Sequence, residues 1–512
     1  MEVDTLILGG GSAGCVLASR LTEDPGREVC LLEAGPDFGP IASGKWPEEI
    51  QRAELGPSSF DWGYEASAGK RQIRYPRGRV LGGSSAINAT GAVWGLASDY
   101  DAWVAKGNPD WGFNDLLPYL GLVENLHGFG APERGREGML RVERDEMPSL
   151  YLDDLASAYE AAGLRCDVDV SSPFTEGGAG RQTWNASDGV RQHAVTAYLE
   201  PVRQRPNLRV ISECLIDRIA WRDGCAEAVE VLVDGRREHF RARQIILAAG
   251  AIGSPTILQR SGIGHPEDLR PILGSEPAIH ALPGVGAGLR DHCSARFAMQ
   301  AAEGAYARLI AAGHQAMPPR PALAARVKSS PELPAFDLDV LAVNWLRQPA
   351  SRADEAFHWA LFLVAPEARG KVTITDRDPN TPPFIDTGFG CPADVQALAR
   401  GIEWLRRVVT EPELRHWYHG ELLPGSAVIG DALREWVAAC MDSYHHSACT
   451  CRMGPASDPT AVVDGSGLVH GFSNLYVMDA STMPEIPRAM INLTVYAMAE
   501  KFAAGFRRNQ SI

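Results

Sequence analysis

Apolar and polar residues in the first 33 positions follow a strand–helix–strand pattern. Residues 3–8 form a short apolar run that ends in glycines, which is typical of a buried parallel strand. Residues 13–21 then have the spacing of a helix, and a turn at residues 24–26 precedes a second apolar run at residues 28–32. This order predicts a βαβ unit at the start of the chain.

Further along, the pattern predicts a sheet assembled from distant segments and a second structural layer. Residues 152–162 and 395–409 have the amphipathic periodicity of helices, whereas residues 243–249 return to an apolar strand. Residues from about 294 to 376 lack βα alternation, so we expect them to form a separate layer. The polar stretch at residues 34–74 shows no clear periodicity, and a stretch of that length is usually functional.

Length and charge narrow the class of protein. With 512 residues the chain is too long for one ordinary core, so we expect two intimately connected domains or one large elaborated domain. The net charge of −15 argues against a surface that binds nucleic acid or an anionic membrane. No apolar run approaches the ~20 residues that span a bilayer, so no transmembrane segment is expected.

The cysteines and the first four residues indicate the cellular compartment of the protein. Residues 1–4 contain neither the basic nor the apolar region of a signal peptide. Most of the ten cysteines lie in apolar contexts, as buried free thiols do in a reducing compartment, so we expect a cytoplasmic protein. Cys449 and Cys451 lack a second Cys/His cluster with ligand spacing, so no metal site is predicted.

The glycine-rich turn after the first strand has the pattern G-x-G-x-x-G. Gly9 permits the tight turn, Gly11 lets a pyrophosphate approach the backbone, and Gly14 allows the helix to pack closely on the strand. Ser12 and Ala13 open the helix, whose free N–H groups and partial positive charge favour phosphate. The turn therefore predicts a dinucleotide site.

An acidic residue at the end of the second strand completes this fingerprint. Glu33 lies 19 residues after Gly14, where a carboxylate can accept hydrogen bonds from the adenosine ribose hydroxyls. The carboxylate disfavours a 2′-phosphate, because two anions would meet. NAD and FAD both remain open at this point.

Three later segments decide between the two cofactors. Residues 78–88 read GRVLGGSSAIN, residues 250–264 read GAIGSPTILQRSGIG, and residues 445–454 read HHSACTCRMG. Together they resemble the glucose–methanol–choline (GMC) family of FAD oxidoreductases, and the first two fit that family's two signature patterns over their full length. The resemblance extends from Val3 to about Phe502 in order and spacing, and it implies FAD as the cofactor.

The resemblance also implies a fold. It predicts an α/β (overall α+β) protein with a Rossmann-like FAD-binding domain built from several segments and a substrate domain that carries a large antiparallel sheet over the flavin. We therefore expect the FAD-binding domain at residues 1–292 and 440–512, with substrate-domain insertions at roughly 150–190. The substrate-binding domain is expected at residues 293–439.

Particular positions match the family's cofactor contacts. The resemblance places five residues beside the pyrophosphate and isoalloxazine, one at the adenine, and two near the ribityl–phosphate end. In that order they are Arg79, Gly82, Gly83, Ser84 and Asn88, then Ile216, then Asp479 and Ala480. No histidine or cysteine near residues 79–88 suggests a covalent link, so we expect tight non-covalent binding.

Alcohol oxidation by a flavin requires hydride transfer to N5 and loss of the hydroxyl proton, and histidine is the usual base near neutral pH. His446 aligns with the family's catalytic histidine, just before the Thr-Cys-Arg-Met-Gly run. His445 is expected to pack against the flavin edge. The resemblance thus predicts His446 as the general base.

The family normally supplies a second polar residue, His or Asn, about 44 positions later, and here that position is Met490. Methionine is a weak acceptor and no donor. Three hypotheses follow: His446 acts alone while Met490 forms an apolar wall for an aromatic substrate, Asn492 or His445 takes the partner's role, or alcohol oxidation is impaired. A helix that begins near Met490 and includes Asn492 and Leu493 would direct its positive N-terminus at the flavin.

The predicted activity is FAD-dependent oxidation of a primary alcohol to the aldehyde, with an aromatic or heteroaromatic substrate. The Cys-Arg-Met-Gly run and residues 421–425 most resemble the pyridoxine-oxidising members of the family. Dioxygen or another acceptor would reoxidise the flavin. The alternatives are a non-redox lyase of the hydroxynitrile lyase type and, less favoured because His446 is retained, light-driven decarboxylation of fatty acids.

Overall fold

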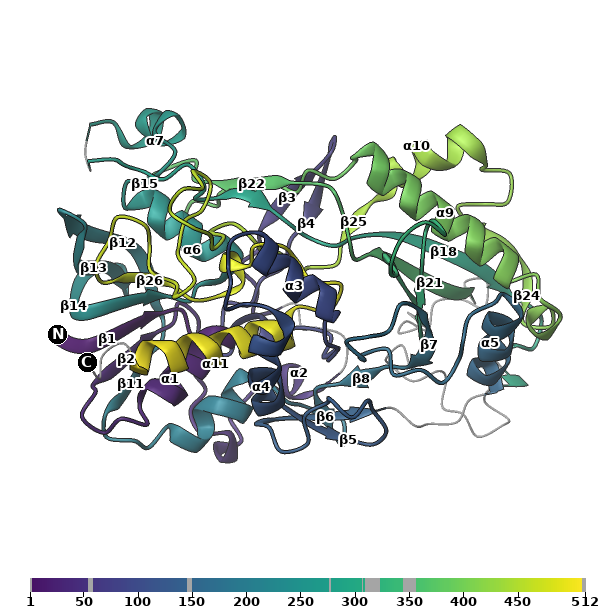
Figure 1. Cartoon of the computed structure of the whole chain (residues 1–512), viewed down its shortest axis with the longest axis horizontal. Coiled ribbons are helices and arrows are strands. Elements are labelled where there is room, and N and C mark those ends of the chain that lie inside the picture. Colours follow the sequence, from purple (N-terminus) through teal and green to yellow (C-terminus); the bar gives the residue numbers. More distant parts are fainter. Residues whose placement is uncertain are drawn as a thin grey trace.

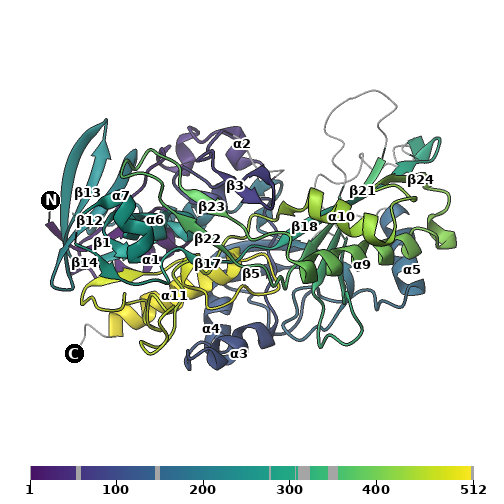
Figure 2. The ribbon, with the colours of Figure 1, turned by 90° about the horizontal axis from the view of Figure 1, so that it is seen from above.

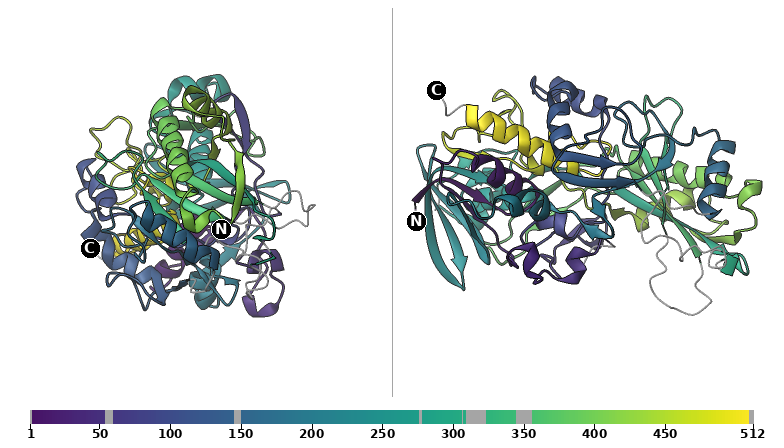
Figure 3. Two further views of the ribbon diagram at one scale, coloured as in Figure 1. Left: turned by 90° about the vertical axis from the view of Figure 1, so that its right-hand side faces the viewer. Right: turned by 90° about the horizontal axis from the view of Figure 1, so that it is seen from below.

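The computed structural model describes residues 2–53, 59–144, 150–275, 278–305, 307–308, 323–343 and 356–508. All predicted site residues lie within these ranges. Residues 309–322 and 344–355 of the predicted substrate domain lie outside them. The elements form two large sheets at opposite ends of an elongated molecule, and both ends of the chain lie at the same end (Figures 1 and 3).

The first sheet confirms the predicted βαβ unit. Its strand order is β11-β2-β1-β14-β13-β12, with β26 also paired to β14. The pairs among β11, β2, β1, β14 and β26 are parallel, and β12 and β13 extend β14 as antiparallel strands. The bounds are β1 Glu2–Leu8, β2 Val29–Leu32, β11 Leu208–Ile211, β12 Cys214–Arg222, β13 Cys225–Val233, β14 Arg236–Leu247 and β26 Leu475–Val477.

Helices cover this sheet, which explains its continuous apolar strands. Leu6, Ile7 and Leu8 of β1 are fully buried, as expected of a parallel strand covered on both faces. Helix α1 (Ser12–Leu21) packs against the C-terminal helix α11 (Asn492–Arg508), and α6 (Gly250–Arg260) packs against β12. Helix α11 begins two residues after the position predicted from the sequence.

The second sheet is antiparallel and confirms the expected separate layer. Its order is β24-β18-β21-β20-β19-β7, and α9 packs on β18, β20 and β21 (Figure 2). Helices α5 and α9 correspond to the two predicted amphipathic helices. The bounds are α5 Leu150–Ala161, β7 Gly178–Arg181, β18 Cys293–Ala301, β19 Leu323–Val327, β20 Leu338–Val343, β21 Ala356–Leu363, α9 Pro392–Val408, β24 Tyr418–Leu423 and α10 Gly430–Cys440.

The polar stretch at residues 34–74 contains regular structure that its sequence does not indicate. Strands β3 (Glu65–Ala68) and β4 (Arg71–Arg74) form a hairpin, and β3 pairs with β23 (Phe384–Asp386) more than 300 residues away. Four-residue strands are too short to show a periodicity, and their partner is remote. They join β22 (Gly370–Thr373) and β17 (Ala287–Leu289) in a small sheet between the two large ones (Figure 1).

The remaining elements of the described residues are short strands, short helical turns and four α-helices. They are η1 Ile41–Ser43, α2 Glu48–Gln51, η2 Gly83–Ala86, α3 Ala97–Ala105, α4 Phe113–Val123, β5 Glu124–His127, β6 Leu140–Arg144, β8 Thr183–Trp184, β9 Ala186–Ser187, β10 Val190–Arg191, η3 Val195–Leu199, η4 Glu200–Val202, β15 Ile263–Gly264, α7 Pro266–Leu273, β16 His280–Ala281, η6 Pro412–Leu414, β25 Asp442–Ser443 and η7 Ala480–Thr482. In the part of the chain that the structure describes, no helix is both long and apolar enough to cross a membrane.

Candidate active site

A cavity of about 960 Å³ lies between the two large sheets. The carboxyl ends of four parallel strands open into it, because residues that follow β1, β2, β14 and β26 line it. On the other side, Leu341 of β20 and Ala360 and Phe362 of β21 line it. Ligands of open α/β sheets bind at the carboxyl ends of the strands, so this cavity is the candidate active site.

Most of the residues predicted from the sequence line this cavity. They are Gly9, Gly11, Ser12, Ala13, Glu33, Arg79, Gly83, Ser84, Asn88, Ile216, Asp479, Ala480, His445, His446, Met490 and Asn492.

Three predicted residues do not line the cavity. A Cβ at Gly14 would come within 1.9 Å of the Gly9 carbonyl oxygen, so this glycine permits the close packing of helix and strand. Gly82 occupies a left-handed turn with φ of 98°. Leu493 is buried in the hydrophobic core of the first sheet. The predicted cofactor contacts of Gly82 and Leu493 stay predictions.

Two glycine-rich loops meet at the cofactor end of the cavity. A Cβ at Gly83 would lie 2.7 Å from the Cα of Gly11, so residue 83 must be a glycine for the two loops to come this close. Helix α1 has no side-chain hydrogen bond at its N-cap, which leaves backbone N–H donors for a ligand. The Asn492 Oδ1 atom accepts a hydrogen bond of 2.9 Å from Ser12 Oγ, which brings the N-terminus of α11 beside that of α1. Two helix N-termini thus face the cavity, and the N–H groups and partial positive charge of each favour an anionic group.

Glu33 is held by backbone donors at the edge of this cavity. Its Oε2 accepts from the N–H of Gly10 and its Oε1 from the N–H of Gly35, each at 2.8 Å. Burial raises the pKa of the carboxyl to about 7, although these hydrogen bonds act in the opposite direction. Ribose hydroxyls that donate to Glu33 would favour its charged form. The adenosine end of FAD fits this position.

Asp479 follows strand β26 as Glu33 follows β2, and it too is held by hydrogen-bond donors at the edge of the cavity. Its Oδ2 accepts from the N–H of Gly250 at 2.9 Å and from the Ser254 hydroxyl, so it joins the starts of α6 and η7. Ile216 lines the cavity from β12, where its carbonyl accepts from Arg260 Nη2 at 3.3 Å. Both residues thus border the cavity, and their contacts with the ribityl–phosphate and adenine ends stay predictions.

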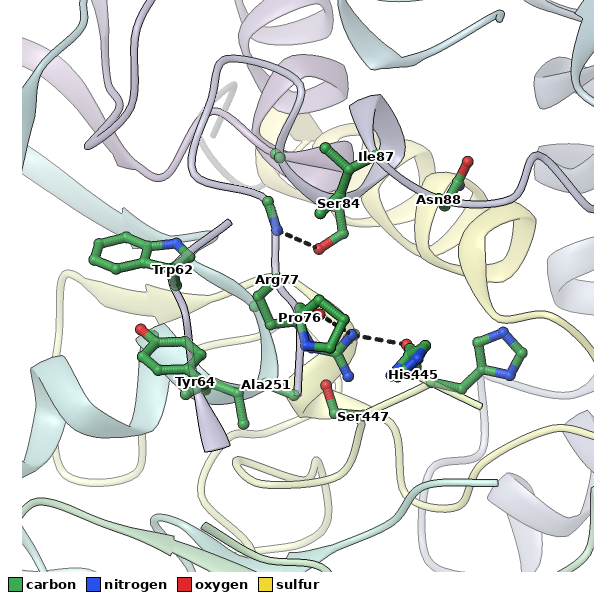
Figure 4. A pocket seen from close by; sticks show the side chains of 18 of the residues that line it. Trp62, Tyr64, Pro76, Arg77, Ser84, Ile87, Asn88, Ala251, His445 and Ser447 are labelled. Carbon is green, nitrogen blue, oxygen red and sulfur yellow. Dashed lines mark hydrogen bonds between the residues drawn. The ribbon is translucent and has the colours of Figure 1, made fainter. Parts of the chain in front are cut away.

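Arg77 crosses the cavity toward the histidine pair, as Figure 4 shows. Its Nη1 donates to the carbonyl of His445 at 2.9 Å, and the N–H of Gly78 donates to Ser84 Oγ at 3.2 Å. The loop after Pro76 therefore connects the glycine-rich signature to the His445–His446 segment. No sequence pattern indicated a role for Arg77.

His446 is fixed at both its backbone and its ring. Its N–H donates to Asp291 Oδ1 at 2.7 Å, and its Nδ1 lies 2.9 Å from Nδ1 of His292. Burial lowers the pKa of His446 well below its usual range, and the nearby His292, His445 and Arg77 act in the same direction. The imidazole is therefore neutral near pH 7 and able to accept a proton.

Asp291 and His292 both contact His446, and the sequence pattern indicated neither of them. Asp291 also accepts hydrogen bonds from the Tyr75 hydroxyl at 2.7 Å and from the Ser443 hydroxyl, and it is almost fully buried. The only signal in the sequence is an Asp-His pair at the start of an otherwise apolar strand. Its distance from His446 along the chain gives no reason to connect the two.

The wall beside His446 is aromatic and apolar. The rings of Phe362 and Tyr444 stack with centroids 3.4 Å apart, and the Tyr444 ring lies 4.2 Å from that of His446. Met490 is buried, and its Sδ accepts a weak hydrogen bond of 3.5 Å from Gln182 Nε2. A Cβ on Gly91 would lie 2.0 Å from this sulfur, so Met490 fits only because residue 91 is a glycine.

The other two candidates for the partner role are held by different contacts. Asn492 accepts from Ser12 at the cofactor end. His445 has a left-handed backbone (φ 67°), donates its N–H to Ser443 Oγ at 2.7 Å, and has a pKa lowered by burial to about 4. No described contact joins either side chain to the His446 ring. Whether one of them acts as a partner stays open.

Comparison with known proteins agrees with this geometry. The family described as GMC oxidoreductase matches residues 3–294 and again residues 366–499. Mitochondrial choline dehydrogenase of Mus musculus is 32% identical over 98% of this chain and 89% of its own length. An oxygen-dependent choline dehydrogenase of Pseudomonas aeruginosa is 32% identical over 100% of this chain and 96% of its own.

Solved structures give the same picture for the fold. The crystal structure of pyridoxine 4-oxidase from Mesorbium loti has a TM-score of 0.87 and 29% sequence identity, and it covers 99% of both chains. Formate oxidase has a TM-score of 0.87 at 22% identity over 100% of this chain and 99% of its own, which bears on the fold alone.

Within the described ranges, no group of three or more His, Cys, Asp or Glu side chains is placed to hold a metal ion.

Proposed function

The chain belongs to the GMC oxidoreductase family, and on that premise we propose that it oxidises a primary alcohol on a neutral aromatic or heteroaromatic ring to the aldehyde. It is an FAD-dependent oxidoreductase that acts on CH–OH donors. FAD, when bound, accepts the hydride from the carbinol carbon. The proposed substrate class rests on one observation: the cavity wall beside His446, which includes the rings of Phe362 and Tyr444, is aromatic and apolar.

His446 is the general base of the proposed reaction. A hydroxyl proton must leave as the hydride leaves, and a neutral imidazole can accept it. Because burial keeps His446 neutral, the base is ready at neutral pH without first losing a proton. The hydrogen bond from its backbone N–H to Asp291 holds the chain at residue 446, and the contact with His292 holds the ring, so little reorganisation is required.

The charged groups of the cavity support a neutral substrate rather than a cationic one. Four carboxylates line it, and each accepts from a backbone N–H: Glu33 and Asp479 as described, Asp61 from Arg77, and Asp442 from Ser443. Five arginines of the described chain line the same cavity, so its charges do not favour a quaternary ammonium group: Arg74, Arg77, Arg79, Arg260 and Arg296. The pyridoxine-type relative is therefore the better guide to substrate class than the choline dehydrogenases.

Four further points belong to this proposal. We assign residues 1–292 and 440–512, with insertions at roughly 150–190, to FAD binding, and residues 293–439 to substrate binding. Strand β7 supports the insertion, because it pairs with β19 of the second sheet. Non-covalent FAD, reoxidation by dioxygen or another acceptor, and a cytoplasmic location are proposed as well, the last supported by ten free cysteines.

An anaerobic substrate panel tests the proposal. The purified holoenzyme is mixed in turn with pyridoxine, benzyl alcohol, hydroxymethylfurfural and choline, and bleaching of the flavin is followed by stopped flow. We expect the aromatic alcohols to reduce the flavin with kcat/KM at least ~10-fold above choline, because an unpaired cation is costly to bury. Faster reduction by choline would overturn the substrate class. No bleaching by any alcohol would favour the lyase alternative, which cleavage of an aromatic hydroxynitrile then tests directly.

A further inference from the structure

We propose that His292 is a positioning residue that fixes the tautomer of His446, so that the cavity-facing nitrogen of His446 carries no proton before the reaction. The inference rests on the proposed function, since it concerns the base of that reaction. His446 lines the cavity, whereas His292 is fully buried behind it. Because Nδ1 of His446 is directed at His292, Nε2 is the ring nitrogen left for the substrate.

The two imidazoles share one proton. Their Nδ1 atoms are 2.9 Å apart and their planes are inclined at 87°, so one Nδ1 must donate and the other must accept. If His446 donates, its Nε2 is bare and can act as a base. If His292 donates, the Nε2 of His446 carries the proton and cannot accept another.

The proposed reaction sets the direction. Nε2 of His446 can accept the alcohol proton only if its Nδ1 donates to His292, so Nδ1 of His292 accepts and its Nε2 carries the hydrogen. No donor of the described residues reaches Nε2 of His292, so nothing requires that nitrogen to accept. The backbone carbonyls of Pro487 and Val364, which raise the pKa of His292, act in the same sense.

Both rings remain neutral, which this arrangement requires. Burial lowers the pKa of His292 to about 3, and the guanidinium groups of Arg326 and Arg290 act in the same direction. Arg77, His445 and His292 disfavour a charge on His446, while the carboxylate of Asp291 is engaged by the His446 backbone rather than by its ring. Among the described groups around His292 and His446, none is an anion that contacts either ring and would stabilise a protonated imidazolium.

His292 is also held firmly enough to act as an orienting group. It precedes β18 directly, and its carbonyl accepts from the N–H of Tyr444 at 2.9 Å. The same loop therefore carries the base and contacts the residue that orients it. A buried partner of this kind fixes both the rotation and the tautomer of an imidazole.

The test compares two substitutions of similar size. His292→Asn can place its Oδ1 to accept from His446, whereas His292→Leu cannot. For an alcohol that reduces the wild-type flavin, we expect His292→Leu to lower the reduction rate ~10-fold or more and His292→Asn to stay within ~3-fold. Equal rates in wild type and His292→Leu, at equal FAD content, would overturn the proposal.

A second measurement does not depend on turnover. In the ¹⁵N-histidine-labelled holoenzyme, NMR should report His446 protonated at Nδ1 in wild type and His292→Asn, and at Nε2 in His292→Leu. Protonation at Nε2 in wild type would refute the inference even if alcohol oxidation is confirmed. If no alcohol reduces the flavin, the proposed function fails, and the same spectra still decide the role of His292. If His292→Leu does not retain FAD, wild type and His292→Asn give the answer.

Discussion

The two ends of the cavity are built in different ways. At the cofactor end, the turn at residues 9–14 and Glu33 form one continuous βαβ unit, and the contacts come mainly from backbone. At the other end, Asp291 and His292, residues 444–446 and Met490 come from three distant parts of the chain, and their side chains form the site. The first end depends on where side chains are absent, and the second on which side chains are present.

This difference predicts how each end responds to substitution. A backbone cradle fails when any Cβ enters it, whatever the chemistry of the new side chain, because the packed loops cannot separate. A site of side chains tolerates changes of shape but not of proton-transfer chemistry. Five predictions test this contrast, from the largest expected effect to the smallest.

Gly14→Val should abolish FAD binding. Its Cβ would lie 1.9 Å from the Gly9 carbonyl oxygen, so α1 must move away from β1 and withdraw its N-terminal donors. We expect a purified protein with little or no flavin, measured as the ratio of flavin to protein absorbance. Gly505→Val is the matched control, since a Cβ there meets nothing within 4 Å and the residue also lies in a helix. A full complement of FAD in Gly14→Val would contradict the backbone-cradle account.

The same contrast explains what could be predicted from the sequence. Gly9, Gly14 and Glu33 are informative because a fixed spacing along one βαβ unit fixes their position in space. His446 was identified only through the resemblance of a whole segment. His292 was missed, because its contact with His446 joins residues 154 positions apart and leaves no periodic signal. The strands β3 and β4 were missed for a related reason, since their partner β23 is remote.

His446→Ala should lower the rate of flavin reduction by alcohol ~10²-fold or more while leaving FAD bound. The hydrogen bond from the residue 446 backbone to Asp291 survives the substitution, so the loop is expected to keep its shape. Stopped-flow reduction of the variant, at matched FAD content, measures the effect. A near-normal reduction rate would remove His446 as the base and with it the proposed chemistry of this end.

The pH dependence of flavin reduction tests whether His446 is neutral near pH 7. The pKa of His446 is lowered well below 6.5, so the neutral base is present above that depressed pKa and is lost only as pH falls through it. The wild-type reduction rate should therefore be flat around neutral pH and should decline only on the acid side, below the usual histidine pKa. A decline that begins near or above pH 7 would show that the imidazole is not held neutral by burial.

Met490 should give the smallest effect, because its proposed role is to shape a wall. Met490→Leu keeps volume and apolar character, and we expect kcat within ~3-fold of wild type. Met490→Asn supplies one of the two polar side chains, His or Asn, that the family resemblance predicts at this position. It also places a polar group against Phe362 and Tyr444, which belong to the same apolar wall. We expect KM for aromatic alcohols to rise several-fold (~3-fold or more) without a gain in kcat. A gain in kcat of ~10-fold would mean that the missing polar partner limits the reaction.

Gly91→Ala tests the same role of Met490 in another way, because it displaces the Met490 side chain without replacing the residue. The new Cβ would lie 2.0 Å from Met490 Sδ, so the thioether must leave its contact with Gln182 and move into the cavity. If Met490 is a wall, Gly91→Ala should raise KM for aromatic alcohols as Met490→Asn does, while kcat changes little. If the chemistry instead depends on a group placed by Met490, kcat should fall in Gly91→Ala as well. The split between KM and kcat therefore decides whether this end of the cavity has one essential side chain, His446, or two.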